Sequence, residues 1–142
     1  MTDFVLRIGH LPDSNLHSRR VGHVSLQLVA TPEYFERHGL PQTPEDFGEH
    51  TVIAASSGDL AHDWHCEIAG RTSTMHINPR LLVNTNQAAI NACKQDLGIC
   101  RVISYEVENE LRAGQLQTLL TEYQLRPLPV HIVYREGPNA SS

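Results

Sequence analysis

A chain of 142 residues suits one domain with a single sizeable hydrophobic core. Hydrophobic residues make up 40 % of the chain and charged residues 19 %, which indicates a folded globular protein and not a disordered segment. The formal net charge is −5 and no basic stripe or tail is present, so nucleic-acid binding by this chain itself is disfavoured. No apolar run approaches the roughly 20 residues of a membrane span. Three cysteines without a C-x-x-C motif, and an N-terminus without a signal-peptide pattern, predict a cytoplasmic protein.

The N-terminal part of the chain predicts two strands and a short capped helix. Apolar and β-branched residues at 4–8, and alternating apolar and polar residues at 24–30, are typical of strands. Thr31 is suited to cap the helix that follows, and Pro32 to occupy its first position. Gly39 predicts its end.

Strands dominate the next part of the chain, after a second Thr-Pro pair at 43–47 that predicts another brief helical turn. The nearly continuous apolar run at 51–55 is typical of a strand buried on both faces. Gly70 followed by Arg71 predicts a tight hairpin between the next two strands. Beyond the buried run, we predict strands at 64–69, 72–77 and 80–84.

A longer helix is predicted at 86–97. Its apolar stripe consists of Ala89, Ile90, Cys93 and Leu97. Gly98 is expected to supply the left-handed residue that ends the helix. On this stripe Cys93 is expected to act as a small buried hydrophobe.

The remaining elements alternate between strand and helix. Ser104 is expected to cap a short helix over 104–114, and Gly114 to end it. We predict strands at 98–103, 116–120 and 128–135. Strand–helix–strand alternation with short turns predicts an α/β fold whose sheet is partly parallel.

Five motifs in this order resemble the effector-binding domain of LysR-type transcriptional regulators. They are LRIGHLPDSNLHSRR, LQLVATPEYFERHGLPQTPEDFGEH, the helix ending DLGICRV, ELRAGQLQTLL and LPVHIVY. The resemblance covers about residues 3–135. It implies an α/β fold of the periplasmic-binding-protein-like (type II) class, with a mixed, mostly parallel sheet flanked by helices. Ile103 stands where the family often has proline, between a strand and the next helix.

The resemblance also implies a division into lobes. Residues 1–31 and 127–142 are expected to form a partial regulatory lobe I, a few strands with the hinge crossings, and residues 32–126 to form regulatory lobe II. The family's winged helix–turn–helix and the first half of lobe I have no counterpart in the sequence. The chain is therefore expected to be a truncated form of such a regulator.

The function implied is ligand sensing, not catalysis. A small, anionic organic effector is expected to bind in a cleft between the lobes, and DNA only through the separate N-terminal winged helix. The full-length protein is expected to be a homo-oligomer, a dimer or a tetramer. The alternatives are a free-standing solute-binding module and, less favoured because no G-x-S-x-G motif is present, a small hydrolase.

The expected effector-binding residues come from loops and strand ends. They are His10, Ala55, Ser56, Ser57, Asn84, Thr85, Asn86 and Val102. Strand ends are where α/β folds place ligand groups.

The stretch that opens the helix at 86–97 has two interpretations. The polar residues before the helix either only cap it, with Gln87 completing a capping box, or also present its N-terminus to an anion. The two interpretations are compatible, because a capping residue can also line a binding site.

Neither a metal nor a cofactor is predicted. His65 and Cys66 would point to opposite faces of a strand, so they could not bind one ion together with His62 or His76. A redox pair of Cys93 and Cys100, as in the peroxide-sensing branch of the family, is disfavoured by the expected burial of Cys93.

Overall fold

The computed structural model describes most of the chain, in six segments: residues 4–8, 17–55, 63–77, 79–123, 125 and 127–134. The chain divides into two compact units. Unit 1 comprises Met1–Ser25 and Pro127–Ser142, and unit 2 comprises Leu26–Arg126. Among the described residues, no helix has the length and apolar character needed to cross a membrane.

Unit 1 contains a three-stranded antiparallel sheet in the order β1 (Phe4–Ile8), β10 (Leu128–Tyr134) and β2 (His17–Val24). The rings of His17 and Tyr134, opposite each other in register, stack with centroids 5.6 Å apart. The predicted strand at 24–30 was wrong in extent, because a break at Ser25 separates the end of β2 from β3.

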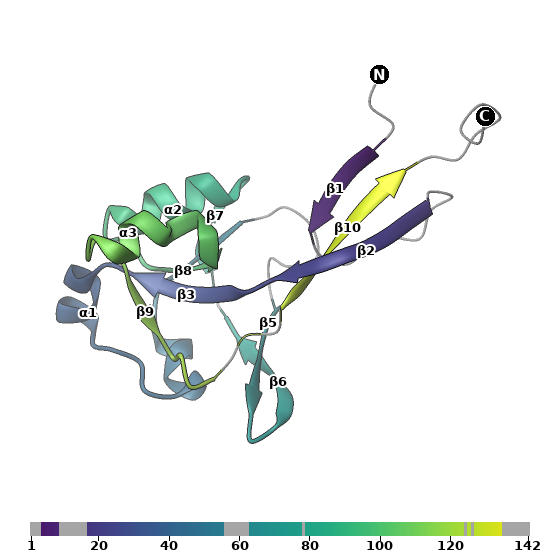
Figure 1. Cartoon of the computed structure of the whole chain (residues 1–142). Coiled ribbons are helices and arrows are strands. Elements are labelled where there is room, and N and C mark those ends of the chain that lie inside the picture. Colours follow the sequence, from purple (N-terminus) through teal and green to yellow (C-terminus); the bar gives the residue numbers. More distant parts are fainter. Residues whose placement is uncertain are drawn as a thin grey trace, which may run out of the picture. The chain divides into compact units, whose positions relative to one another are not determined.

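The main sheet lies in unit 2 (Figure 1). Its order is β7 (Pro79–Val83), β4 (Val52–Ala55), β8 (Ile99–Ile103), β3 (Leu26–Ala30) and β9 (Gln117–Leu119). β4 is parallel to β7 and β8, whereas β3 is antiparallel to β8 and β9. Four of the five strands therefore run in one direction, which confirms the predicted mixed, mostly parallel sheet. The three buried residues of β4 confirm its burial on both faces.

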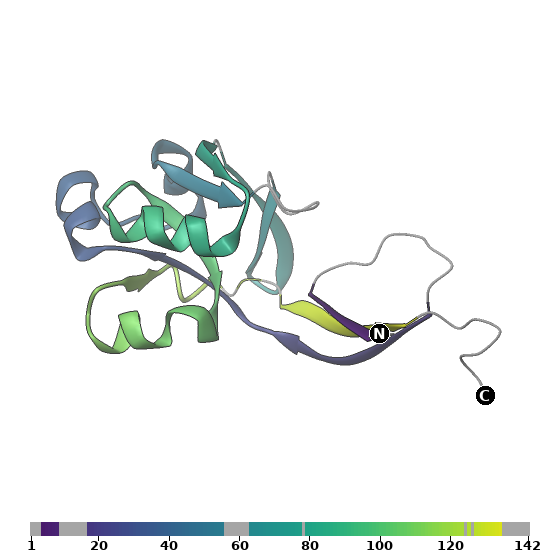
Figure 2. The same cartoon turned by 90° about the horizontal axis from the view of Figure 1, so that it is seen from above.

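Helical segments connect these strands. They are α1 (Pro32–His38), the 3₁₀ helix η1 (Pro44–Glu49), α2 (Asn86–Lys94), the 3₁₀ helix η2 (Ser104–Val107) and α3 (Glu108–Arg112). α2 and α3 lie side by side, as Figure 2 shows, and Lys94 Nζ lies 3.9 Å from Glu110 Oε2. α1 begins and ends as predicted: Thr31 Oγ1 accepts a hydrogen bond from the N–H of Tyr34, and Gly39 has φ of +84°.

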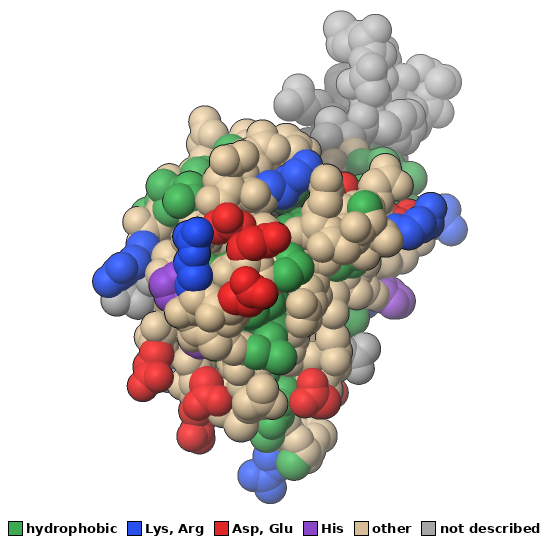
Figure 3. Space-filling view, turned by 90° about the vertical axis from the view of Figure 1, so that its left-hand side faces the viewer, with side chains coloured by type: hydrophobic (Ala, Val, Ile, Leu, Met, Phe, Trp, Pro, Cys, Tyr) green, Lys and Arg blue, Asp and Glu red, His purple; other side chains and the backbone are tan. Residues whose placement is uncertain are grey.

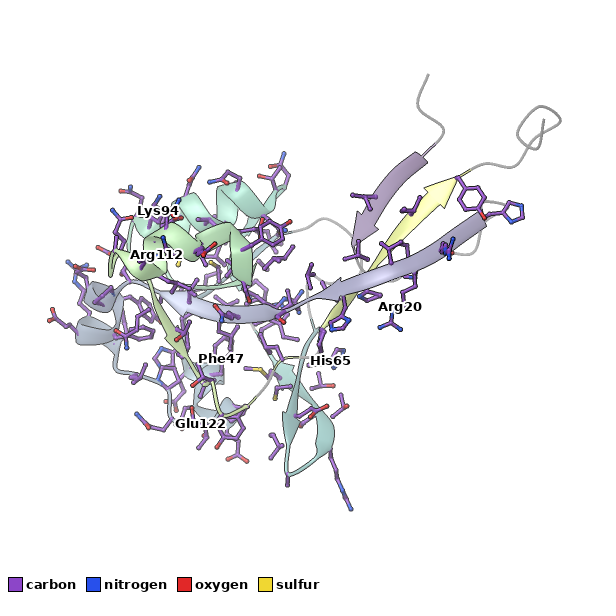
Figure 4. The ribbon with its side chains drawn as sticks, viewed as in Figure 1. Arg20, Phe47, His65, Lys94, Arg112 and Glu122 are labelled. Carbon is purple, nitrogen blue, oxygen red and sulfur yellow. The ribbon has the colours of Figure 1, made fainter. Side chains whose placement is uncertain are left out.

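Both faces of the unit 2 sheet are covered. On one face the thiol of Cys100 hydrogen-bonds that of Cys93 in α2, whose Sγ donates to the carbonyl of Val29. On the other face the Arg101 guanidinium lies 5.1 Å from the ring centroid of Trp64, in β5 (Asp63–Ile68). β5 forms the predicted hairpin with β6 (Arg71–His76). Figure 4 shows the two layers, with Lys94 of α2 on the helix side of the sheet and Phe47 on the other.

The predicted C-terminal end of α2 was wrong. The helix ends at Lys94, and the left-handed residue after it is Asp96, with φ of +66°. Leu97 is 53 % exposed, so it does not belong to the apolar stripe. Gly98 instead lets two chain segments approach closely, because a Cβ there would lie 2.7 Å from the carbonyl oxygen of Thr51.

The predicted cap of the next helix was also wrong. Ser104 lies within η2, and the residue before that helix is Ile103. The N–H of Ile103 donates to Glu106 Oε1 over 2.9 Å. A proline at this position could not make this bond because it has no N–H.

Candidate functional site

Three parallel strands of unit 2 end at one edge of the sheet, which we call the carboxyl edge. β4 ends at Ala55, which is paired in register with Val83 at the end of β7. Asn84 follows β7 directly, and β8 ends one residue after Val102. The carboxyl edge of parallel strands is where α/β folds bind ligands, so the fold brings Ala55, Asn84 and Val102 to the expected place.

The N-terminus of α2 lies at this same edge, because only Asn84 and Thr85 separate the helix from β7. Thr85 is the N-cap, and its Oγ1 accepts a hydrogen bond of 3.0 Å from the N–H of Ala88. Asn84, Thr85 and Asn86 are all exposed. The prediction that Gln87 completes a capping box was wrong: its amide donates to Asn91 Oδ1 over 3.1 Å.

Two features make the first turn of α2 electropositive. With Thr85 bound to Ala88, the N–H groups of Asn86 and Gln87 have no acceptor within the helix. The turn also contains no acidic side chain, whereas the first turns of α1 and α3 contain Glu33 and Glu108. The positive end of the helix dipole is therefore not neutralised by the helix itself.

Val102 and Gln27 form a second part of the edge. Val102 is only 2 % exposed, so little of it is open to a ligand. Its partner in register on β3 is Gln27, whose Oε1 is buried and has no hydrogen-bond partner. Sequence reasoning missed Gln27, because a polar residue between the leucines of a strand is typical of a solvent-facing position.

Three of the expected site residues, His10, Ser56 and Ser57, lie outside the described residues. His62, considered as a metal ligand, also lies outside them.

The cysteines are not suited to redox sensing. All three are buried free thiols. The hydrogen bond with Cys93, together with burial, raises the pKa of Cys100 well above its usual value. Burial likewise raises the pKa of Cys66. A reactive thiol needs the opposite, a lowered pKa and exposure.

Two of the side chains considered as metal ligands, His65 and Cys66, are neighbours in β5. Cys66 is buried while His65 is exposed and hydrogen-bonded through Nδ1 to Thr74 Oγ1, so the two side chains do lie on opposite faces. Over the part of the chain that the structure describes, no three His, Cys, Asp or Glu side chains are close enough to hold a metal ion.

The charged groups of unit 2 include the guanidinium of Arg101 in β8. Burial lowers the pKa of Arg101 to about 10, so this guanidinium stays charged at neutral pH, on the face of the sheet opposite α2. On the face shown in Figure 3, acidic and basic side chains are interspersed.

An open groove of about 420 Å³ lies at another place on unit 2, beside α3 and the start of β9. Its lining consists of Pro32, Leu111, Gly114, Leu116, Gln117 and Thr118. None of the expected effector-binding residues belongs to it.

The sequence matches the family model described as "LysR substrate binding domain" over residues 1–142. An uncharacterized HTH-type transcriptional regulator of Haemophilus influenzae is 31 % identical over 132 residues, which are 93 % of this chain and 46 % of that protein. The HTH-type transcriptional activator AaeR of Escherichia coli is 31 % identical over 137 residues, or 94 % and 43 % of the two chains. The chain thus spans somewhat less than half the length of these relatives.

Solved structures of regulatory domains share the fold. The regulatory domain of AphB from Vibrio vulnificus has a TM-score of 0.78 and 26 % identity, and the match covers 97 % of this chain and 69 % of that one. The regulatory domain of CrgA, a LysR-type transcriptional regulator from Neisseria meningitidis, has a TM-score of 0.80 and 27 % identity, over 94 % and 66 % of the two chains.

Proposed function

The chain belongs to the LysR substrate-binding domain family, and we propose that it is the ligand-sensing part of a LysR-type transcription factor. In this proposal a small, anionic organic effector binds at the carboxyl edge of the unit 2 sheet. The chain itself catalyses no reaction and requires no cofactor. The family match and the similarity to regulatory domains of known regulators support this assignment.

The observation that carries the choice of an anion is the first turn of α2. Its N–H groups at Asn86 and Gln87 lack intrahelical acceptors, and no acidic side chain occupies the turn. A carboxylate at such a position gains roughly 0.3–1 kcal/mol from the helix dipole at an exposed site. Hydrogen bonds from the two N–H groups to a charged acceptor would add to this.

The expected site residues are retained in the proposal. Asn84, Thr85 and Asn86 offer side-chain and main-chain groups around the anion, and Ala55 forms an apolar wall beside them. Val102 contributes apolar surface beneath them. His10, Ser56 and Ser57 remain predictions from the sequence.

The larger assembly is part of the same proposal. Residues 1–31 with 127–142 are assigned to a partial lobe I, and residues 32–126 to lobe II, which the division of the chain at Leu26 and Arg126 supports. In the whole protein, a cytoplasmic dimer or tetramer, a winged helix outside this chain binds DNA. Effector binding favours one arrangement of the regulatory domain over another, and this changes how the winged helices contact DNA.

An NMR titration tests the site. The isotope-labelled chain is titrated with acetate, succinate and benzoate, and separately with the neutral amides acetamide, succinamide and benzamide. The carboxylates should shift the main-chain amide signals of Asn86 and Gln87 more than the matched amides do, because only the carboxylates carry the charge. Equal shifts with acids and amides, or acid-specific shifts confined to other regions, would contradict an anion site at this edge.

A further inference from the structure

We propose that Gln27 determines effector specificity, by accepting a hydrogen bond from a donor group on the effector. This inference rests on the proposed function and deepens it. The effector class it implies is a small carboxylate that also carries a hydroxyl or ammonium group. The carboxylate would bind at the first turn of α2, and the donor group would bind at the Gln27 amide oxygen.

The sheet register brings Gln27 to the carboxyl edge. β3 is antiparallel to β8, so the start of β3 lies beside the end of β8, and Gln27 is paired directly with Val102. Residues paired directly across two strands have their side chains on the same face of the sheet. Gln27 therefore shares the face of Val102.

That face is the one covered by α2. Cys100 contacts Cys93 of α2, and Val102 lies two residues further along the same strand, so both project from the α2 face. Ala55 lies on this face as well, because Ile53 is paired with Cys100 and Ala55 lies two residues beyond Ile53. The face thus holds, at one edge, an electropositive helix start, an apolar strip of Ala55 and Val102, and the Gln27 amide.

The amide oxygen of Gln27 is unusual among the buried polar groups of unit 2. Within the described part of this unit, it is the only buried side-chain nitrogen or oxygen without a hydrogen-bond partner. Elsewhere in the unit such groups are paired: Thr31 Oγ1 bonds both Asp96 and the N–H of Tyr34, and the Tyr34 hydroxyl bonds His50 and Thr51. Because folded proteins pair nearly all their buried polar atoms, an unpaired acceptor at a binding edge points to a donor that arrives with a ligand.

The chemistry of the edge then indicates a ligand class. An amide oxygen accepts hydrogen bonds and repels a second carboxylate, so the group that meets Gln27 must be a donor. The N–H groups of Asn86 and Gln87 need an acceptor, preferably a charged one. A dicarboxylate without a donor group would satisfy only the helix end and would leave the Gln27 oxygen unpaired.

The test uses two matched pairs of acids, 3-hydroxybutyrate with butyrate and lactate with propionate. Binding to the isotope-labelled full chain is followed by NMR at the amides of Asn86 and Gln87 and at the side-chain amide of Gln27. In at least one pair the hydroxy acid should bind roughly three- to tenfold more tightly than its partner, as expected for one additional net hydrogen bond. It should also shift the Gln27 side-chain signals.

Variants isolate the role of Gln27. In Gln27→Met, which keeps the length of the side chain and removes the acceptor, the preference for the hydroxy acid should disappear, the affinity for the unsubstituted acid should be unchanged, and the melting temperature should be equal or higher. Gln27→Asn, which retains an amide but withdraws it by one methylene, should also reduce the preference. Gln117→Met, the same substitution at an exposed position of β9, is the control and should retain the preference.

The outcomes separate this inference from the proposed function. If the acids shift the amides of Asn86 and Gln87 but the hydroxyl group makes no difference in either pair, the role of Gln27 is refuted while the anion site stands. A preference that survives in Gln27→Met also refutes it. A lowered melting temperature in Gln27→Met would assign Gln27 a structural role instead. If no acid affects the carboxyl edge, the anion site and the inference both fail.

Discussion

Replacing Gly98 by alanine should destabilise unit 2, because at this glycine the chain before β8 passes close to the chain before β4. A Cβ at position 98 would lie 2.7 Å from the carbonyl oxygen of Thr51, 3.1 Å from its Cγ2 and 3.2 Å from its carbonyl carbon. The first of these contacts is with the main chain, which no side-chain rotation can relieve. The neighbouring Ile99 N–H donates to the same oxygen over 2.9 Å.

The expected loss of stability follows from two contributions. Inserting a methyl group into a packed region costs about 1–3 kcal/mol. Lengthening or breaking the Ile99–Thr51 hydrogen bond costs about 1 kcal/mol more. The sum of about 2–4 kcal/mol corresponds to a fall in melting temperature of roughly 6–12 °C for a domain of this size.

Urea and thermal unfolding, followed by circular dichroism, measure the effect. Gly48→Ala is the matched control, because no atom lies within 4 Å of a Cβ at that position. The double variant Gly98→Ala with Thr51→Ser removes the Cγ2 contact but keeps the main-chain clash, so it should recover little stability. Full recovery, or a loss in Gly98→Ala no larger than in Gly48→Ala, would refute the close approach as the reason for glycine here.

Three further substitutions or conditions test the edge and its surroundings. Thr85→Ala should lower the free energy of unfolding by about 1 kcal/mol, and Thr85→Ser by less, because the serine hydroxyl can still accept from the N–H of Ala88. Asn86→Leu should leave the melting temperature unchanged, since the side chain is exposed. In a reporter assay, a full-length regulator carrying this substitution should respond more weakly to its effector. An unchanged response would exclude Asn86 from the site. Stability should fall as the pH drops below about 6.5, because burial and the nearby charge of His38 lower the pKa of His50, so the unfolded chain binds the proton more readily. This fall, measured by urea unfolding at several pH values, should be smaller in His50→Asn, and an equal fall in that variant would assign the pH dependence to other groups.

Local signals in the sequence predicted local structure well. The ends of α1 are where Thr31, Pro32 and Gly39 predicted them, because capping involves only neighbouring side-chain and main-chain groups. The buried run at 52–55 was equally clear. By contrast, most of β2 was missed, because its sequence HSRRVGHV is polar and the strand it pairs with, β10, lies about a hundred residues away. Such pairing leaves no trace in a short window of sequence.

Two errors in unit 2 have the same origin. Gly98 follows the helix as a terminating glycine would, but its backbone serves the contact with Thr51, nearly fifty residues earlier, while Asp96 ends the helix. Gln27 has the polar character of an exposed strand position, but tertiary packing buries its amide oxygen. The sequence could predict that a helix begins at the strand ends, but not that tertiary packing buries the amide oxygen of Gln27 on β3.

β8 links these observations, because its two ends fix the geometry of the carboxyl edge. At its start, Gly98 and the hydrogen bond from Ile99 to Thr51 hold β8 close to the residue that precedes β4. At its end, the N–H of Ile103 is held by Glu106, a bond that a proline at this position would exclude. Between these ends the contact of Cys100 with α2 fixes the orientation of the strand, and so aligns Val102 with Gln27. In the proposed function, the electropositive start of α2 attracts small acids in general. Gln27, held in register with Val102 by the pairing of β3 with β8, then distinguishes one acid from another.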